Sequence, residues 1–212
     1  MLMKCVRTLV CGLAVLGISS ANAGSYDDFF IAIINDNAST VGGLLQRGFD
    51  PNTRDPKGQP GLTIAMQEQS LKAARVLLSS RDIDVNALNQ AGESALMMAA
   101  LKGDMQGVQL LLERDARINQ PGWSPIHYAA TGPEPKLVRL LLDRGADLNA
   151  TSPNGSTPLM MAAQYGSEDT VKLLLERGAD PKQRNQLDLS AVDFAKLSGR
   201  APVVTRLEQA QR

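Results

Sequence analysis

The sequence predicts an all-α solenoid in which stacked helix-turn-helix units are joined by β-hairpin fingers. The same order of residues recurs along the chain: Gly, Ser or Thr with Pro, an apolar pair, Ala-Ala, a turn and a Leu-rich segment. In the aligned copies, the alanine of the first helix falls at Ala32, Ala65, Ala99, Ala129, Ala162 and Ala195. These positions are 33, 34, 30, 33 and 33 residues apart. A period of this size is typical of repeat arrays, whose units depend on their neighbours to bury their apolar faces.

One unit shows how the residues set the local structure. Thr157 is suited to cap a first helix, and Pro158 to fill its first position, where a missing N–H has no cost. Gly166 breaks the chain before a second helix, which carries Leu174 on an apolar face with helical spacing. Gly178 follows the last turn of that helix, where the backbone is expected to turn left-handed. These signals predict two helices per unit.

We divide the chain into a leader at residues 1–23 and a single repeat domain at residues 24–212, with about six units. The predicted units are 25–54, 55–87, 88–120, 121–150, 151–183 and 184–212. The first and the last are interpreted as polar end caps. The first should form helices over Asp28–Ile34 and Ser39–Arg47 without a Thr-Pro opening, and the last has Asp188 where other copies have Gly.

Residues 1–23 have the layout of a secretory signal peptide. Lys4 and Arg7 give a positive start, the stretch from Thr8 to Ile18 is apolar, and residues 21–23 (Ala-Asn-Ala) form a small-x-small cleavage site. An uncleaved membrane anchor is the alternative, but about 11 apolar residues fall short of the ~20 that a spanning helix needs. We therefore expect cleavage after Ala23 and no stable membrane anchor afterwards.

The cysteines and the glycosylation motifs bear on the compartment. Cys5 and Cys11 both lie in the leader, so the mature chain would have no disulfide, no thiol nucleophile and no cysteine metal site. Sequons for N-glycosylation begin at Asn37, Asn149 and Asn154. A glycan on Asn149 would disturb the base of a finger, and a bacterial periplasm avoids this conflict. The prediction is therefore export to the periplasm.

Charge and motifs argue against nucleic acid binding and catalysis. Without Lys4 and Arg7, the chain has 20 basic and 22 acidic residues, a formal net charge of −2 with its one His neutral. A nucleic-acid surface normally shows a basic stripe. The sequence contains no nucleophile elbow, phosphate loop, zinc-protease motif or cysteine pair with metal spacing. We predict no catalytic residues, no metal and no cofactor.

The repeated pattern resembles the ankyrin repeat over nearly all of residues 25–208. The clearest match comprises Gly155, Thr157, Pro158, Leu159, Ala162, Ala163, Gly166, Val171, Leu174, Leu175, Gly178, Ala179 and Asp180. The resemblance implies that His127 ties adjacent fingers together by hydrogen bonds, so we interpret it as structural. It also implies that another protein binds along the concave side, through the finger tips and the exposed face of each first helix.

Aligned with that family, eight residues are the candidates for partner contact: Leu88, Leu101, Lys102, Trp123, Pro153, Asn154, Gln164 and Tyr165. Leu88, Leu101, Trp123 and Tyr165 place large apolar or aromatic groups at positions expected to face outward. Trp and Tyr are frequent at binding hot spots. Two alternatives stay open: single exposed apolar residues are normal on any surface, and Trp123 could simply pack over its own finger.

The finger before Trp123 departs from the family pattern. Only Gln120 and Pro121 separate Asn119 from Gly122, whereas five residues separate the matching Asn149 and Gly155. This finger should be truncated and leave a notch in the row of tips. The notch could admit part of a partner, or it could be loop drift without a role.

Three classes of function follow, in decreasing order of support. The first is a monomeric, non-catalytic periplasmic module that binds another protein through its concave face. The second is a secreted effector or an immunity-type binding protein that acts outside the producing cell. The third is an enzyme, which would need a catalytic constellation that the sequence does not show.

Overall fold

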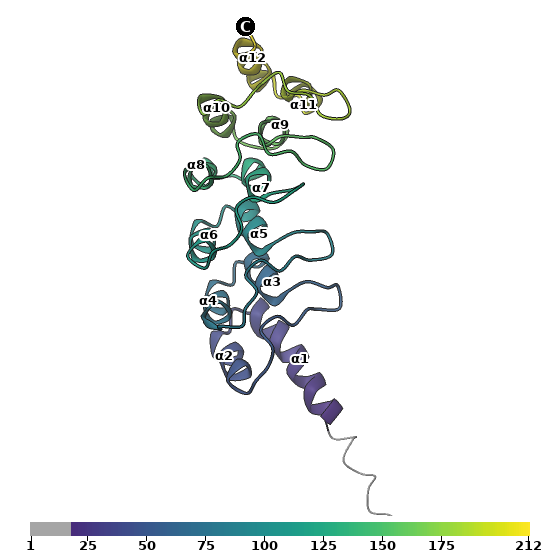
Figure 1. Ribbon diagram of the computed structural model, residues 1–212, viewed down its shortest axis with the longest axis vertical. Helices are drawn as coiled ribbons and strands as arrows, with labels where there is room; N and C mark the ends of the chain where they lie inside the picture. Colours follow the sequence, from purple (N-terminus) through teal and green to yellow (C-terminus); the bar gives the residue numbers. More distant parts are fainter. Residues whose placement is uncertain (1–17) are drawn as a thin grey trace, which may run out of the picture.

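The computed structural model describes residues 18–212, and the predictions made on residues 1–17 lie outside this range. The described residues form twelve α-helices in six consecutive pairs (Figure 1). The pairs are α1 (Ile18–Ile34) and α2 (Ala38–Gln46), α3 (Gly61–Gln67) and α4 (Leu71–Ser79), α5 (Ala95–Lys102) and α6 (Met105–Leu112), α7 (Pro125–Thr131) and α8 (Pro135–Asp143), α9 (Pro158–Gln164) and α10 (Glu168–Glu176), and α11 (Ala191–Leu197) and α12 (Ala201–Ala210). The predicted all-α repeat architecture is confirmed.

The pairs stack into two layers and one row of loops. Odd-numbered helices follow one another along the middle of the stack, even-numbered helices lie along one side, and the loops that precede α3, α5, α7, α9 and α11 project from the other side (Figure 1). These loops are the predicted fingers. The loop before α7 projects less far than those before α5 and α9, as the shortened sequence predicts (Figure 1).

The core runs the length of the stack between the two layers. The even-numbered helices bury Leu77, Leu111, Leu141, Leu174 and Leu207 completely. The odd-numbered helices bury the aligned alanines almost completely, and these small side chains allow neighbouring helices to approach closely. Each unit thus contributes its leucines to one continuous core.

Capping follows the predicted residues and shows which atoms are used. The Thr157 hydroxyl accepts the Met160 N–H at 3.3 Å, and the Met160 sulfur accepts the Thr157 N–H at 3.4 Å. Ser94 and Met97 form the same reciprocal pair. A methionine sulfur therefore does at this helix start what a Glu or Gln side chain does in the usual capping box.

The fingers differ from the predicted β-hairpins. Single antiparallel bridges, such as Leu88↔Ser94, replace paired strands in the described residues. The Asn89 side chain explains this, because its Oδ1 accepts the N–H groups of Ala91 and Glu93 at 2.9 Å each. Side-chain hydrogen bonds of this kind offer the backbone an alternative to a strand ladder.

The first unit contains the two expected helices, but α1 begins at Ile18 rather than at Asp28. Residues 18–27 contain no proline, so nothing in that stretch blocks the hydrogen bonds of a helix. The predicted cleavage point after Ala23 therefore falls within α1. At the turn that follows, Asp36 has a positive φ and the Asn37 side chain caps α2, as expected for turn residues.

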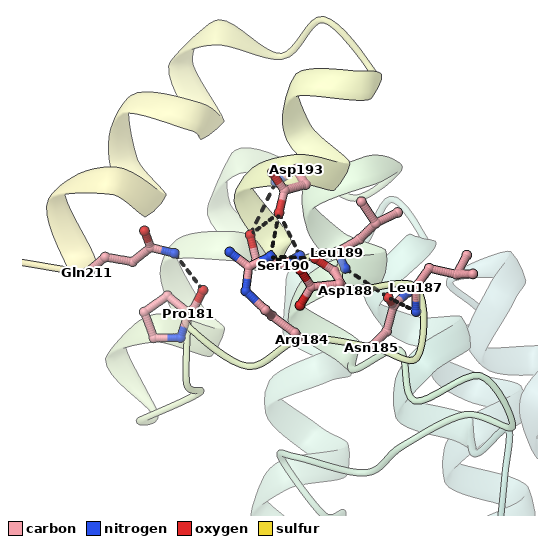
Figure 2. A network of polar contacts seen from close by, with 9 residues as sticks. All are labelled: Pro181, Arg184, Asn185, Leu187, Asp188, Leu189, Ser190, Asp193 and Gln211. Atoms are coloured by element: carbon pink, nitrogen blue, oxygen red, sulfur yellow. Dashed lines mark hydrogen bonds and ion pairs between the residues drawn. The ribbon is translucent and has the colours of Figure 1, made fainter.

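The last unit is stabilised by a polar network (Figure 2). The Asp193 carboxylate accepts the N–H of Ser190 at 2.8 Å and its hydroxyl at 2.6 Å, and Arg184 lies 3.7 Å away. These Ser190 hydrogen bonds, together with Arg184, hold the pKa of Asp193 below its usual value. The Gln211 amide donates to the Pro181 carbonyl at 2.8 Å and ties the end of α12 to the start of the finger before α11.

Candidate protein-binding face

The fingers and the exposed side of the odd-numbered helices form one surface, here called the finger face. It corresponds to the predicted concave side, and all eight candidate residues lie on it. The exposed candidates are Leu101, Lys102, Pro153, Asn154 and Tyr165, and the half-buried ones are Leu88, Trp123 and Gln164. The structure therefore separates residues that a partner can reach freely from residues that are partly covered.

Leu88 is the candidate most engaged within the protein. It forms the bridge to Ser94, and its carbonyl accepts Arg54 Nη1 from the preceding finger at 2.7 Å. Leu88 is half-buried, so part of it is covered by the protein and its contact with a partner stays a prediction.

The exposed large apolar residues are concentrated on the finger face. In the described residues these are Ile31, Ile34, Leu101, Tyr165, Leu187 and Leu197, between 39% and 71% exposed. All six lie on an odd-numbered helix, directly after one, or in a finger. The exposed positions of α4, α8 and α10 include Lys72, Arg75, Lys136, Arg139 and Lys172 instead. The two long sides of the stack thus differ in chemistry.

Four of these six residues were not predicted, although the sequence carries a signal for two of them. Ile34 and Leu197 occupy the same position in their units as Leu101, two residues after the aligned alanine. A comparison of this position in all six units would have identified both Ile34 and Leu197. Ile31 and Leu187 belong to the first and last units, which had been interpreted as polar caps.

An open pocket of about 190 Å³ lies on the finger face where α5, α7 and α9 come together. It is lined by Leu101, Trp123, His127, Tyr128, Thr131 and Met161. The pocket brings together Leu101 and Trp123, two of the predicted candidates. Tyr128 and Met161 occupy equivalent positions in successive units, one residue before the aligned alanine, and were not predicted.

Trp123 both packs inside the protein and lines this pocket. Its ring meets His127 edge-on, with centroids 5.3 Å apart, and Tyr128 with centroids 6.3 Å apart. Gln120 Nε2 donates to the Trp123 carbonyl at 2.9 Å, which fixes the short finger beneath the ring. Trp123 therefore packs against α7 rather than over its own finger, and because the residue is only half-buried, its contact with a partner stays a prediction.

His127 holds the next finger in place, as expected. Its Nδ1 lies 3.2 Å from the Ser124 backbone N–H, which only donates, so Nδ1 accepts. Its Nε2 lies 3.1 Å from the carbonyls of Ala150 and Ser156, which only accept, so Nε2 carries the proton. Burial holds the pKa of His127 below its usual 6.5, more strongly than these carbonyl contacts raise it. The ring is thus a neutral, fully engaged structural group.

Tyr128 connects the pocket to a carboxylate in the preceding unit. Its hydroxyl donates to Glu93 Oε1 at 2.9 Å, and Asn89 Nδ2 donates to Glu93 Oε2 at 2.8 Å. Burial, and then the contact with Glu93, raises the pKa of the Tyr128 phenol well above its usual range. The Thr131 hydroxyl donates to the Tyr128 carbonyl at 2.8 Å. The phenol therefore stays protonated and holds the Glu93 carboxylate next to Tyr128, which lines the pocket.

The truncated finger has a second hollow on its other side. This open hollow, of about 500 Å³, is lined by residues 119–122 and by Asp147, Ala150 and Thr151. Asn119 fixes it at the base, because its side chain donates to the Gly145 carbonyl and accepts the Asp147 N–H. The shortened loop thus leaves open space beside it.

Neither a metal cluster nor a membrane span is visible in the part of the chain that the structure describes. Within it, no three His, Cys, Asp or Glu side chains lie together as metal ligands would. Within the same range, no helix combines the length and the apolar character needed to span a bilayer.

The stacked helix pairs, the projecting fingers and the apolar finger face define a repeat array of the kind that presents one long side to other molecules. The comparison with family models identifies it further: the model for ankyrin repeats in three copies matches residues 29–122 and 117–185. The chain belongs to the ankyrin-repeat family.

Two relatives and one solved structure agree with this assignment. The chain is 33% identical over 86 residues to human transient receptor potential cation channel subfamily A member 1, covering 41% of this chain and 8% of that protein. It is 29% identical over 122 residues to NF-kappa-B inhibitor alpha from Sus scrofa, covering 55% of this chain and 38% of that protein. The chain therefore spans less than half of the length of either relative.

One structural neighbour is a chain from the complex of a predatory endopeptidase from Bdellovibrio bacteriovorus with an immunity protein. It matches with a TM-score of 0.74 and 24% identity, covering 86% of this chain and 97% of that one. This likeness shows the fold.

Proposed function

We propose that this protein is a non-catalytic binding module of the bacterial periplasm that holds a partner protein against its finger face. One observation carries the proposal: the exposed large apolar residues of the described chain all lie on that face. Apolar groups grouped on one side are a feature of protein interaction sites. The ankyrin-repeat family, in which protein binding is the common role, supports the same function.

The neutral His127 supports the non-catalytic part of the proposal. Both ring nitrogens are occupied by backbone groups of the protein. A general base must be within hydrogen-bond reach of a substrate proton. His127 could take that role only by giving up the bonds that hold the next finger.

The location rests on the leader, so its test is independent of binding. The chain expressed with its own leader should appear in the periplasmic fraction and begin at Gly24. N-terminal sequencing of the protein from fractionated cells measures this directly. Protein that stays in the cytosol with Met1 intact would contradict the location and leave the binding function to be judged separately.

Binding is best tested with a variant that removes apolar groups by using residues from sister units. Tyr165→Ser, Leu187→Asn and Leu197→Gln introduce the residues found at the equivalent positions Ser198, Asn154 and Gln164. The protein, exported with its leader and purified, is immobilised and exposed to a periplasmic extract. We expect the triple variant to lose most of the captured partner.

The matched control changes the opposite side of the stack. Arg75→Gln, Arg139→Gln and Lys172→Gln alter exposed residues of α4, α8 and α10 and should leave capture unchanged. Equal capture by the triple variant, or loss in the control, would place the contact elsewhere. A captured toxin or secreted peptidase would favour the immunity-type role, which is a finer form of the same function.

A further inference from the structure

We propose that the pocket between α5, α7 and α9 takes one bulky apolar side chain of the partner, and that the partner carries a basic residue next to it, facing Glu93. This inference rests on the proposed function and specifies the chemistry of the partner at that face. The pocket is lined by Leu101, Trp123, His127, Tyr128, Thr131 and Met161.

The size of the pocket indicates a single side chain. Sites for whole small-molecule ligands span roughly 300–1,000 Å³, whereas this pocket measures about 190 Å³. Binding hot spots are commonly single large residues that fill a pocket on the opposite protein. An anchor side chain of the partner therefore fits the site better than a free ligand.

The hydrogen-bond donors that line the pocket are already used within the protein, which favours an apolar anchor. The Nε2–H of His127 is used by two carbonyls, the Tyr128 hydroxyl by Glu93, and the Thr131 hydroxyl by the Tyr128 carbonyl. None of these three donors is left for an incoming group. An anchor that carries a hydrogen-bond acceptor would lose its water without regaining a bond from these donors, and burial of a polar group without a partner is costly. Leu101 and Met161 complete the lining with purely apolar surface.

The negative charge of Glu93, beside the pocket, indicates which residue the partner carries next to its apolar side chain. Glu93 is half-buried, and its two oxygens accept from a phenol and an amide, which are both neutral. No ion pair within the described residues compensates its charge, because the ion pairs there involve other acids, such as Asp36 and Asp143. Complementary charge across an interface favours the correct partner and its register. A Lys or Arg beside the apolar anchor satisfies this requirement.

Trp123 provides a direct probe, because it is the one tryptophan of the sequence and lines the pocket. The full chain, exported and purified, is titrated with three blocked tripeptides while the tryptophan emission is recorded. The peptides are acetyl-Arg-Phe-Arg-amide, acetyl-Glu-Phe-Glu-amide and acetyl-Arg-Ser-Arg-amide. The symmetric design makes the order of the two residue types irrelevant.

We expect saturable binding of the Arg-Phe-Arg peptide. It should bind at least about fivefold more tightly than the Arg-Ser-Arg peptide, which corresponds to the ~1 kcal/mol of a significant contact. It should also bind more tightly than the Glu-Phe-Glu peptide. Equal binding of the Phe and Ser peptides would overturn the apolar anchor, and unchanged emission with all three would overturn the site.

Two variants separate the parts of the proposal. Glu93→Gln keeps an acceptor for Tyr128 and uses the residue present at the equivalent Gln59. It should abolish the preference for Arg over Glu peptides and retain binding of Phe. Leu101→Gln uses the residue of Gln67 and Gln164 and should weaken the Phe peptides at least about fivefold. Circular dichroism of both variants confirms that the helices persist.

Failure of this inference can be distinguished from failure of the proposed function. The capture experiment changes only residues outside the pocket, namely Tyr165, Leu187 and Leu197. If capture depends on those residues but the peptides do not bind, the finger face binds a partner and the pocket does not specify it. An Arg-over-Glu preference that survives Glu93→Gln would overturn the role of Glu93 alone.

Discussion

The fingers before α7 and α9 are held to the finger that follows them by different means. The finger before α9 bonds directly to the next one: the Gln186 N–H donates to the Asn154 carbonyl at 2.9 Å, and Gln186 Nε2 to the Pro153 carbonyl at 3.0 Å. The truncated finger before α7 lacks the residues that make these bonds at the tip. Here His127 reaches from α7 to the Ala150 and Ser156 carbonyls.

The difference explains why a histidine is present in one unit and absent in its neighbour. Met160 stands at the equivalent position in the next unit, where its sulfur accepts only the N–H of its own cap residue, Thr157. The full-length finger there has its own connections to the next finger. A histidine that bridges units is therefore most valuable where a short finger bonds to the next loop only at its base, through Asn119, and not at its tip.

Core substitutions should have the largest effect, and the same effect in both units. Leu141→Ala in α8 and Leu174→Ala in α10 each remove a completely buried side chain. Each should lower the free energy of unfolding by roughly 2–5 kcal/mol, measured by urea denaturation. A large difference between the two would show that the units differ in their helical cores as well as in their fingers.

The control for this pair is Glu176→Ala, on the surface of α10. Its carboxylate forms an exposed i,i+4 pair with Lys172 at 3.8 Å, and such pairs contribute about 0.3–0.5 kcal/mol. The variant should therefore unfold close to the parent. A loss comparable with that of Leu174→Ala would contradict the assignment of the apolar helix face.

Substitution of His127 and of Met160, which stands at the equivalent position, tests the comparison itself. His127→Met leaves the Ala150 and Ser156 carbonyls without their imidazole donor and should cost about 1–3 kcal/mol. Met160→Leu makes a substitution of similar size at the equivalent position and should cost less than about 1.5 kcal/mol. Denaturation of both variants gives the difference. Equal costs would mean that His127 is no more important to its finger than Met160 is to its own.

Replacement of Trp123 tests whether the short finger contributes to partner contact. Trp123→Ser introduces the residue found at the equivalent Ser156. It should weaken binding of a captured partner by more than ~1 kcal/mol, or about fivefold, as for an important contact. Tyr165→Ala should have a similar effect, since Tyr165 is exposed on the same face. Calorimetric titration measures both, and unchanged affinity with intact helices would exclude these two residues from the contact.

The sequence predicted features that depend on local chemistry. The cap at Thr157 and the left-handed Gly178 both follow from rules that act within a few residues. The truncated finger was also predicted, because the repeat alignment shows which residues are missing, and the role of His127 was implied by the resemblance to the ankyrin repeat.

Other features could not be predicted, because they depend on contacts between units. The bond between Tyr128 and Glu93 joins residues 35 positions apart and leaves no local pattern. The half-buried state of Leu88 depends on Arg54 of the preceding finger, which bonds to its carbonyl. The single bridges of the fingers arise from side chains such as Asn89 that occupy the tip N–H groups. In a repeat array, the alignment predicts the position of a residue, whereas its neighbours decide its exposure.

The smallest effect should be a dependence of stability on pH that belongs to the short finger alone. His127 is the one histidine of the sequence, and burial lowers its pKa from 6.5 in the folded state. Below about pH 6.5 the unfolded chain therefore takes up a proton that the folded chain resists, so stability falls as the pH falls. The stability that depends on neutral His127 is fully present above the pKa of the histidine in the unfolded chain. It is lost progressively as the pH falls toward the lower pKa of the histidine in the folded chain. Asp193 has a lowered pKa as well, but it titrates in a more acidic range than His127 and does not affect stability between pH 5.5 and 7.5.

Melting temperatures measured at pH 7.5 and at pH 5.5 test this dependence. The melting temperature should be lower at pH 5.5 than at pH 7.5 for the parent and for Met160→Leu, and the difference should be much smaller for His127→Met. An equal decrease in all three proteins would show that the imidazole is not the group responsible, and the bridge to Ala150 and Ser156 would then have to hold with the ring protonated as well as neutral.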